Sequence, residues 1–344
     1  MVIRIMSALL LVCLLLFYQS ACMQPRLQHP AVDATRLPEL NPARALMADG
    51  YSLPLSINQP VGDVQAVLLA LHGFNDYRNA FHDPARLFAQ HGILTVAYDQ
   101  RGFGETAQRG LWPGHVQLQQ DAQTMVRLLC EHYPGVPLYL LGESMGGAVA
   151  IEVLQQQLPD CVAGTILVAP AIWGWQTMPW WQSMVLRAAA HLFPAATVTG
   201  EGLEITPSDN IEMLRALGRD PLVIKSTRID TIFGLTNLMD AAYSHSAKIP
   251  LPTLLLYGMH DEIIPPGAMC RFQREFLADA PDSRTMVLYP QGYHMLTRDL
   301  QATTVLEDII AWIRQRRADL PSGNRVTSGS GRLLELCAAA GIPL

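Results

Sequence analysis

The segment Gly142-Glu143-Ser144-Met145-Gly146-Gly147 holds the residue types of a serine nucleophile on a tight turn. It lies between an apolar, strand-like run and a helix-like run. A Gly-x-Ser-x-Gly sequence in that setting is typical of a nucleophile elbow. Glycine is needed at Gly142 and Gly146 because a Cβ there would collide with neighbouring backbone. The pattern predicts that Ser144 is a nucleophile in a strained backbone conformation, which costs roughly 1–3 kcal/mol. An ordinary glycine-rich turn is the alternative.

A serine hydroxyl attacks efficiently when a base takes its proton and a carboxylate orients that base. In one large class of hydrolases the three residues follow the order serine, acid, histidine. The acid is expected after the apolar run 253–257, which leads into Gly258-Met259-His260-Asp261. Asp261 is the predicted acid, and its neighbour Glu262 is the second candidate. A turn aspartate that caps the next helix is the structural alternative for Asp261.

One histidine occupies the position that the base of such a triad requires. The chain has 10 histidines, and His294 is the one that follows the last strand-like run, 285–289, and precedes the last core helix. His260 also lies late in the chain, but it adjoins the carboxylate on the same loop. Ser144, Asp261 and His294 therefore follow three different strand-like runs in the required order. This arrangement favours a triad over three unrelated structural residues.

The tetrahedral intermediate of acyl transfer needs hydrogen-bond donors for its oxyanion. One is expected from the backbone N–H of Met145, at a helix N-terminus whose dipole favours negative charge. The second is expected in the loop after an early strand, at Phe74 in His72-Gly73-Phe74. His72 itself is expected to brace this loop. The chemistry requires no metal and no organic cofactor, and we expect none.

The elements that must position these residues alternate between short apolar runs and helix-like segments. The runs are continuously apolar, as expected of strands buried on both faces: 66–71, 93–98, 137–141 and 162–169. The alternation predicts an α/β fold with a mostly parallel central sheet and helices on both faces. Functional sites in such sheets gather at the carboxyl ends of the strands. Ser144 follows one of those ends.

From residue 171 to residue 246 the strand rhythm stops, and helix-like segments alternate with Pro and Gly. We interpret this insertion as a helical cap over the strand ends, placed before the last two strands. Its first segment holds four of the six tryptophans, namely Trp173, Trp175, Trp180 and Trp181. Because tryptophan favours places with one apolar side and one wet side, they predict an acyl-chain pocket or a membrane-touching rim. Packing of the cap onto the core is the alternative.

The N-terminus has the features of an export signal. Arg4 precedes the apolar run 5–18, which has the length of a signal-peptide core and is short for a membrane span. Gln19-Ser20-Ala21-Cys22 resembles a lipoprotein cleavage site at which Cys22 becomes lipidated. We therefore expect a protein that is exported or membrane-anchored, in the periplasm or the cell envelope. A plain signal peptide, an uncleaved anchor helix and a location on the cytoplasmic face are the alternatives.

The composition limits the number of domains and the kinds of partner. With 344 residues, of which 50% are hydrophobic, the chain can bury a large core in one or two domains. A formal net charge of −6 argues against nucleic acid as a partner. Six cysteines are too few for a disulfide scaffold. Cys130 and Cys161 either pair or remain buried free thiols.

These observations predict an organisation in five parts. They are a leader over 1–22, a tether over 23–45, an α/β core over 46–170 and 247–317, a helical cap over 171–246 and a C-terminal tail over 318–344.

Over residues 45 to 317 the chain resembles the α/β-hydrolases that include monoacylglycerol lipases and lysophospholipases. The matching segments are His72-Gly73-Phe74, Asp99-Gln100-Arg101-Gly102-Phe103-Gly104, Gly142-Glu143-Ser144-Met145-Gly146-Gly147, Gly258-Met259-His260-Asp261 and Gly292-Tyr293-His294. The resemblance implies that Ser144, Asp261 and His294 form the triad and that Phe74 and Met145 supply the oxyanion hole. It also implies that the loop beginning at Asp99 braces the site.

The expected function is therefore a serine ester hydrolase that cleaves acylglycerols or lysophospholipids through an acyl-enzyme. Its substrate would be a small lipid ester, and its contact with a membrane would involve the N-terminus and the cap. The same triad serves cofactor-free haloperoxidases, C–C hydrolases and acyltransferases, which are alternative reaction types. A catalytically silent module that binds a ligand is an alternative of a different class.

Overall fold

The computed structural model describes residues 27–28, 36–202, 204–278, 283–315, 319–327 and 329–342. The expected leader, with Cys22, lies outside the described residues. None of the helices in the described ranges combines the length and the apolar character that crossing a membrane requires.

A ten-stranded sheet forms the centre of the molecule, in the order β1-β2-β3-β5-β4-β6-β7-β10-β11-β12. Its middle strands are parallel: β5 (Ile93–Tyr98), β4 (Ala66–Leu71), β6 (Leu138–Glu143), β7 (Val162–Val168), β10 (Thr253–Gly258) and β11 (Arg284–Tyr289). The outer strands are antiparallel: β1 (Glu39–Asn41), β2 (Arg44–Leu46), β3 (Ser52–Asn58) and β12 (Arg325–Val326). This sheet confirms the predicted α/β-hydrolase fold class.

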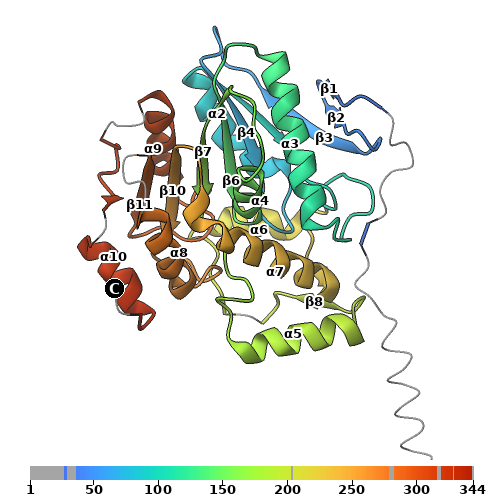
Figure 1. Ribbon diagram of the computed structural model, residues 1–344, viewed down its shortest axis with the longest axis vertical. Coiled ribbons are helices and arrows are strands. Elements are labelled where there is room, and N and C mark those ends of the chain that lie inside the picture. Colours follow the sequence, from blue (N-terminus) through green and yellow to red (C-terminus); the bar gives the residue numbers. More distant parts are fainter. Residues whose placement is uncertain are drawn as a thin grey trace, which may run out of the picture.

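Helices cover both faces of the sheet (Figure 1). The helices on one face are η1 (Arg78–Phe81), α2 (His82–Gln90) and α9 (Ala302–Arg314). Those on the other face are α3 (His115–His132), α4 (Met145–Val153) and α8 (Pro266–Ala278). Successive residues of β4 alternate between the two core layers, with Leu68 on the α9 side and Leu69 on the α4 side. That alternation explains why the parallel strands read as continuously apolar runs.

The segment between β7 and β10 is largely helical. It contains α5 (Trp180–Leu192), α6 (Ile211–Arg219), α7 (Ile229–Ser244), η2 (Ser246–Lys248) and a small sheet of β8 (Thr197–Thr199) and β9 (Ser226–Arg228). α7 packs on α4, and α5 lies beyond α7 at the edge of the molecule (Figure 1). The start of α4, which follows the elbow, therefore lies under this layer.

The expected tether differs from the structure at its C-terminal end. Residues 39–46 form the β1–β2 hairpin, which extends the sheet by pairing with β3. Further toward the N-terminus, Leu27 makes a parallel bridge to Trp112, and Gln28 Nε2 donates a 2.8 Å hydrogen bond to the carbonyl of Leu111. Strands of three residues are too short to show a periodic pattern. The chain is therefore already docked on the core at Leu27.

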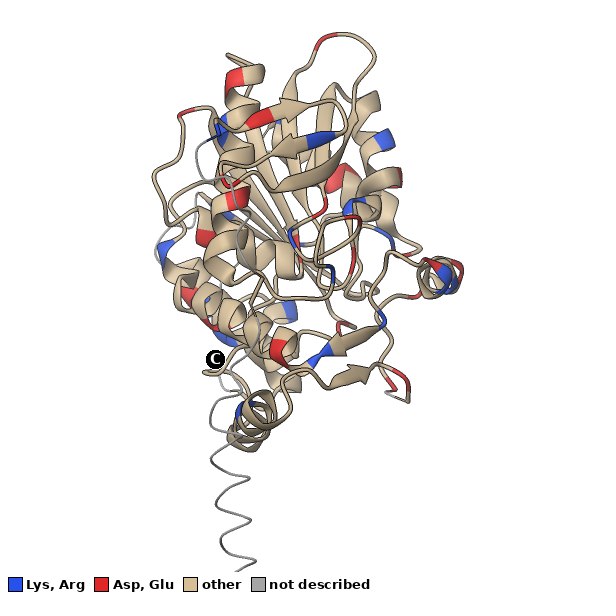
Figure 2. Ribbon diagram, turned by 90° about the vertical axis from the view of Figure 1, so that its right-hand side faces the viewer, with Lys and Arg blue, Asp and Glu red and all other residues tan. Residues whose placement is uncertain are grey.

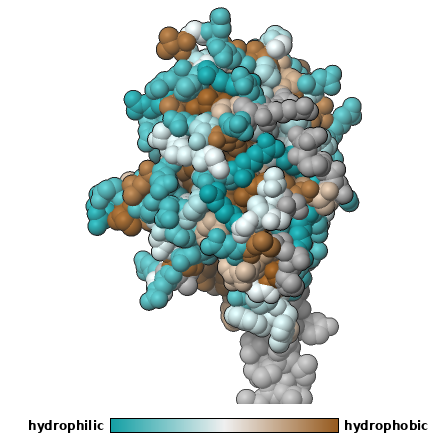
Figure 3. Space-filling view, turned by 90° about the vertical axis from the view of Figure 1, so that its left-hand side faces the viewer, coloured by the Kyte–Doolittle hydropathy of each residue, from teal (hydrophilic) through white to brown (hydrophobic). Residues whose placement is uncertain are grey.

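The expected tail also belongs to the domain in part. β12 pairs with β11, and α10 (Gly331–Ala339) packs against α8. A disulfide joins Cys270 of α8 to Cys337 of α10. Figure 3 shows this side of the molecule, where hydrophilic and apolar residues are interspersed. The Gly- and Ser-rich composition around a two-residue strand gave no sign of this packing.

A second disulfide joins Cys130, near the end of α3, to Cys161, just before β7. Of the two interpretations that the sequence left open for these cysteines, the structure therefore shows the paired one.

Candidate active site

The elbow places Ser144 between β6 and α4 in a conformation that few residues adopt. Its φ is 53° and its ψ is −116°, so Ser144 is one of the few non-glycine residues with a positive φ in the described part of the chain. The flanking glycines are required by close backbone approach. A Cβ on Gly142 would lie 2.3 Å from the carbonyl oxygen of Gly146, and one on Gly146 would lie 2.1 Å from that of Leu71. The close packing at Gly142 and Gly146 therefore maintains the strained conformation of Ser144, and it leaves no room for a larger residue at either glycine.

His294 and Asp261 form a buried hydrogen-bonded pair. The two atoms, His294 Nδ1 and Asp261 Oδ2, are 2.8 Å apart. The other oxygen of Asp261 accepts hydrogen bonds from the backbone N–H groups of Ile263 and Ile264, which fix the carboxylate. The neighbouring Glu262 instead accepts a 2.6 Å hydrogen bond from the backbone N–H of Thr206, in the segment between β7 and β10. Of the two acids considered from the sequence, Asp261 is the one beside the histidine.

The surroundings of His294 favour its charged form. Burial disfavours the imidazolium, but the charge and hydrogen bond of Asp261 outweigh burial and raise the pKa of His294 above its ordinary value. Glu143 raises the same pKa further, whereas Arg298 lowers it. Such a setting stabilises the imidazolium that forms when a histidine accepts a proton during a reaction.

The loop after β4 lies directly beside Ser144. A Cβ on Gly73 would lie 3.4 Å from the Cβ of Ser144, which places the neighbouring Phe74 next to the elbow. Met145 is the first residue of α4, where backbone N–H groups have no partner within the helix. His72 is buried, and its Nε2 accepts a hydrogen bond from the backbone N–H of Gln100 at 2.9 Å. That contact braces the loop against the segment that follows β5.

A cavity of about 480 Å³ opens beside the elbow. Its walls include Ser144, His294, Gly73 and Phe74. The remaining wall is mostly apolar and comes largely from the segment between β7 and β10: Ala171, Trp173, Met178, Leu186, Pro207, Leu214, Leu217, Ile232, Leu235, Thr236 and Met239. The volume lies within the usual range of small-molecule sites. Ser144 and His294 therefore line one cavity whose remaining wall is mostly apolar.

The four tryptophans of the cap lie in different environments. Trp173 lines the cavity. Trp175 does not line it, because its ring lies under the Arg187 guanidinium, 4.0 Å from the ring centroid, and its Nε1 donates to Asn237. Trp180 and Trp181 are 74% and 54% exposed on α5. The expected acyl pocket therefore includes one of the four, and two others lie on the surface.

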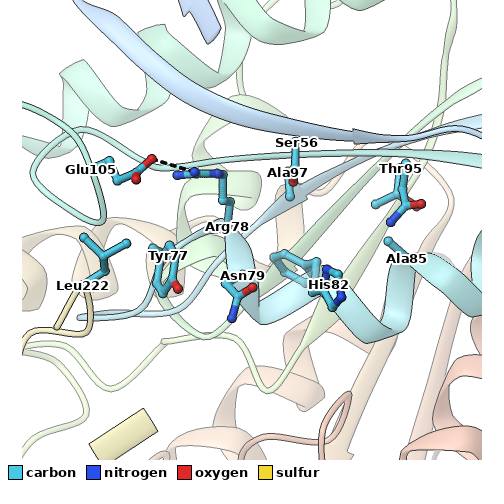
Figure 4. A pocket seen from close by; sticks show the side chains of 12 residues that line it. Ser56, Tyr77, Arg78, Asn79, His82, Ala85, Thr95, Ala97, Glu105 and Leu222 are labelled. Atoms are coloured by element: carbon cyan, nitrogen blue, oxygen red, sulfur yellow. Dashed lines mark hydrogen bonds and ion pairs between the residues drawn. The ribbon is translucent and has the colours of Figure 1, made fainter. Parts of the chain in front are cut away.

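Another cavity, of about 290 Å³, lies away from the elbow between η1, α2 and the β3–β5 edge (Figure 4). Its side chains include Arg78, which pairs with Glu105 at 2.6 Å. Arg78 also pairs with Asp99, at 2.5 Å. These contacts hold the loop that begins at Asp99, and Ser144 and His294 do not line this cavity.

An ion network between largely buried side chains, which was not predicted from the sequence, lies beside the elbow. Arg298 donates from Nη1 to Asp76 Oδ2 and from Nη2 to Glu143 Oε1, each at 2.7 Å. All three residues line the cavity that holds Ser144. One signal was present, because Glu143 closely follows the strand 137–141, which was predicted to be buried, and a buried charge requires a partner.

Comparison with known proteins places the chain among hydrolases. Residues 62–301 match the family described as "Serine aminopeptidase, S33". Human monoglyceride lipase is 26% identical over 313 residues, which cover 86% of this chain and 95% of that protein. The monoacylglycerol lipase of Mycolicibacterium smegmatis is 24% identical over 278 residues, which cover 77% of this chain and 93% of the relative.

A solved structure shows the same fold. A soluble variant of the Saccharomyces cerevisiae monoglyceride lipase superposes with a TM-score of 0.66 at 21% identity, covering 85% of this chain and 99% of the other. The family match spans most of the chain and includes both Ser144 and His294. The chain therefore belongs to the serine aminopeptidase S33 family of hydrolases and has the α/β-hydrolase fold of the monoacylglycerol lipases that it resembles.

Proposed function

We propose that this protein is a serine ester hydrolase that cleaves lipid esters with one acyl chain, such as monoacylglycerols or lysophospholipids. The observation that carries the proposal is the cavity with a mostly apolar wall that is lined by both the strained Ser144 and the Asp261-bound His294. The similarity to monoglyceride lipases over most of their length supports the same reading.

In the proposed reaction, Ser144 Oγ attacks the ester carbonyl carbon while His294 Nε2 takes the hydroxyl proton. The N–H groups of Met145 and Phe74 donate hydrogen bonds to the oxyanion that forms. The intermediate then collapses, the C–O bond to the alcohol breaks, and His294 returns the proton to the leaving oxygen. Water attacks the acyl-enzyme by the same route and releases the fatty acid. Asp261 stabilises the imidazolium in both halves.

The apolar wall of the cavity fits an acyl chain. Leu186, Leu214 and Leu235 come from three different helices, α5, α6 and α7, and all face the same space. Transfer of each methylene of a linear hydrocarbon from water into such a cavity is favourable by about 0.8 kcal/mol. The charged side chains of the wall, Asp76, Glu143 and Arg298, come from the loops around Ser144, where the ester and its head group would bind.

A peptide substrate, which the family's description suggests, fits this cavity less well. An aminopeptidase needs a carboxylate that is free to bind the substrate's terminal ammonium. Among the described residues that line the cavity, the acidic side chains other than those of the proposed triad are Asp76 and Glu143. Both are occupied by Arg298. A lipid ester without a terminal ammonium to bind there therefore suits the site better than a peptide N-terminus.

A panel of esters tests the proposal together with a variant that fills the cavity. We expect monoacylglycerols with long chains to be hydrolysed with a higher kcat/KM than short p-nitrophenyl esters, and aminoacyl anilides not to be hydrolysed. In Leu235→Trp the larger ring takes acyl-chain space, so KM for the long-chain ester should rise about tenfold while the short ester is unaffected. Leu334→Trp, at an exposed position of α10, is the matched control. Preferential hydrolysis of aminoacyl anilides would contradict the proposal.

We further propose that α5 contacts a lipid surface. Trp180, Trp181, Met184 and Val185 share one exposed face of this helix. The helix contains no acidic residue (Figure 2), and Arg187 and His191 are its titratable side chains. An interfacial helix typically has this composition, with aromatic and aliphatic residues on one side and basic residues beside them. Leu186 on the same helix lines the cavity, so lipid would reach Ser144 by a short path.

Export and anchoring through the N-terminus fit the same arrangement, and we propose both. The chain is docked at Leu27 beside Trp112, and Trp112 and Phe233 of α7 line one surface cavity. Five residues from Cys22 to Leu27 reach at most about 18 Å when fully extended. A lipidated Cys22 would therefore hold the core close to the membrane. The two disulfides fit an oxidising compartment.

Fractionation of cells that express the full chain tests both contacts. We expect the wild type to remain with membranes and Cys22→Ala to lose most of this association, because one lipid anchor contributes more than one helix face. The triple variant Trp180→Ser/Trp181→Ser/Val185→Ser should lose a smaller part. Val61→Ser, at an exposed residue in the β3–β4 loop, is the matched control and should behave as the wild type. Recovery of the wild type in the soluble cytosol would contradict the proposal.

A further inference from the structure

Arg298 lies where the three loops of the proposed reaction meet. One terminal nitrogen of its guanidinium binds Asp76, in the loop of Phe74, and the other binds Glu143, which directly precedes Ser144. Arg298 itself lies four residues after His294. One side chain therefore connects the oxyanion loop, the nucleophile elbow and the histidine loop.

Each contact is reinforced by its own loop. The second oxygen of Glu143 accepts a 2.6 Å hydrogen bond from Thr297, the neighbour of Arg298. The N–H of Asp76 donates to the carbonyl of Gly73 at 3.3 Å, and this turn encloses Phe74. A shift of Asp76 would therefore move the backbone that is expected to supply the second oxyanion donor. A continuous series of contacts therefore links the Arg298 guanidinium, through Asp76, to the backbone N–H of Phe74.

The chemistry of the network explains why arginine stands at this position. Two buried carboxylates so close together are unfavourable unless a cation separates them. The guanidinium of arginine presents N–H donors from two terminal nitrogens on a rigid plane, so it fixes the distance between two acceptors as well as neutralising one charge. Lysine would supply the charge without that fixed spacing.

We propose that Arg298 is a positioning residue that sets the distance between the oxyanion loop and the nucleophile elbow. The proposal rests on the proposed function, because it assumes that Ser144 and Phe74 act in one reaction. Arg298 exchanges no proton and acts through Asp76 and Glu143.

The network also has an electrostatic signature at His294. The charged groups that act on His294 come from three elements: Asp261 after β10, Glu143 on β6, and Arg298 on the histidine's own loop. The positive charge of Arg298 lowers the pKa of His294, and the negative charge of Glu143 raises it. Removing the charge of Arg298 should therefore raise the pKa of His294, and removing the charge of Glu143 should lower it.

The test compares Arg298→Met, Arg298→Lys and Glu143→Gln with the wild type, using a short p-nitrophenyl ester. In Arg298→Met we expect kcat to fall roughly 10²-fold with little change in KM, as a misplacement of about 1 Å produces. In Arg298→Lys, which keeps the charge, kcat should fall less. This variant carries the test if the methionine variant does not fold. Because His294 must be neutral to take a proton, the acid limb of kcat/KM should move to higher pH in Arg298→Met and to lower pH in Glu143→Gln.

Arg284→Lys is the matched control. Arg284 is also buried, but it lies at the opposite end of β11, where it donates to the carbonyl of Phe276 at 2.7 Å. Equal losses in Arg284→Lys and Arg298→Lys, or an unmoved acid limb in a folded Arg298→Met or Glu143→Gln variant, would overturn the proposal. Failure of the proposed function is a separate result, in which the wild type neither hydrolyses esters nor reacts with a fluorophosphonate. If the wild type labels without hydrolysing the ester, the labelling rate replaces kcat in the same comparison.

Discussion

Replacing Ser144 by alanine is expected to abolish ester hydrolysis while leaving the fold intact. Loss of the nucleophile from a serine triad lowers kcat by on the order of 10⁴–10⁶. The substitution removes one hydroxyl from a side chain whose strained backbone, with φ of 53°, belongs to the turn as a whole. The thermal unfolding temperature should therefore change little. The measurement is kcat/KM on the preferred ester together with labelling by a fluorophosphonate probe.

Labelling also separates an enzyme from a silent binding module. The wild type should react with the probe, and Ser144→Ala should not. Ser56→Ala is the matched control, because Ser56 is an exposed serine on β3 and does not line the cavity that holds Ser144. A wild type that does not label, or a Ser144→Ala variant that keeps its turnover, would remove the proposed mechanism.

Asp261→Asn is expected to lower kcat by about 10⁴-fold, the loss typical of such a change in a serine triad. Asparagine can keep one oxygen for the N–H groups of Ile263 and Ile264, so the turn should remain. It would then present an NH₂ group to His294 Nδ1. That contact favours the tautomer with hydrogen on Nε2, which cannot accept the serine proton. The fold survives while the base is in the wrong form.

Glu262→Gln is the control that the chain itself supplies. Glu262 is the adjacent residue and carries the same charge, but it accepts from the N–H of Thr206 and not from His294. We expect its kcat to remain within a few-fold of the wild type, because glutamine retains an oxygen for that contact. Kinetics of both variants on one ester decide the assignment. Comparable losses in the two, or an unchanged kcat in Asp261→Asn, would show that Asp261 does not orient the base.

The fold and the position of the elbow could be predicted because they depend on local patterns. A strand buried on both faces, such as β4, must be apolar throughout, and the elbow requires glycine where backbones touch. These constraints act between neighbours in the sequence. The order of Ser144, Asp261 and His294 along the chain then followed from the order of the strands.

Other features depend on contacts that no local pattern records. Arg298 and Asp76 are 222 residues apart in the sequence, and nothing near either residue identifies its partner. The choice between Asp261 and Glu262 depended on the direction of two adjacent side chains in one turn. The pairing of Cys270 with Cys337 required α10 to fold back on α8.

That last disulfide has a consequence for proteolysis. The bond closes a covalent loop across a sequence separation of 67 residues, which contains β11, α9 and His294. A protease that cuts once inside this loop produces two fragments that remain joined, with the His294 segment still attached to the core that holds Asp261. Nicked protein would therefore migrate as an intact chain on a gel without reductant and as two pieces with it. The C-terminal helix, usually the first part of a domain to be trimmed, is here secured against loss.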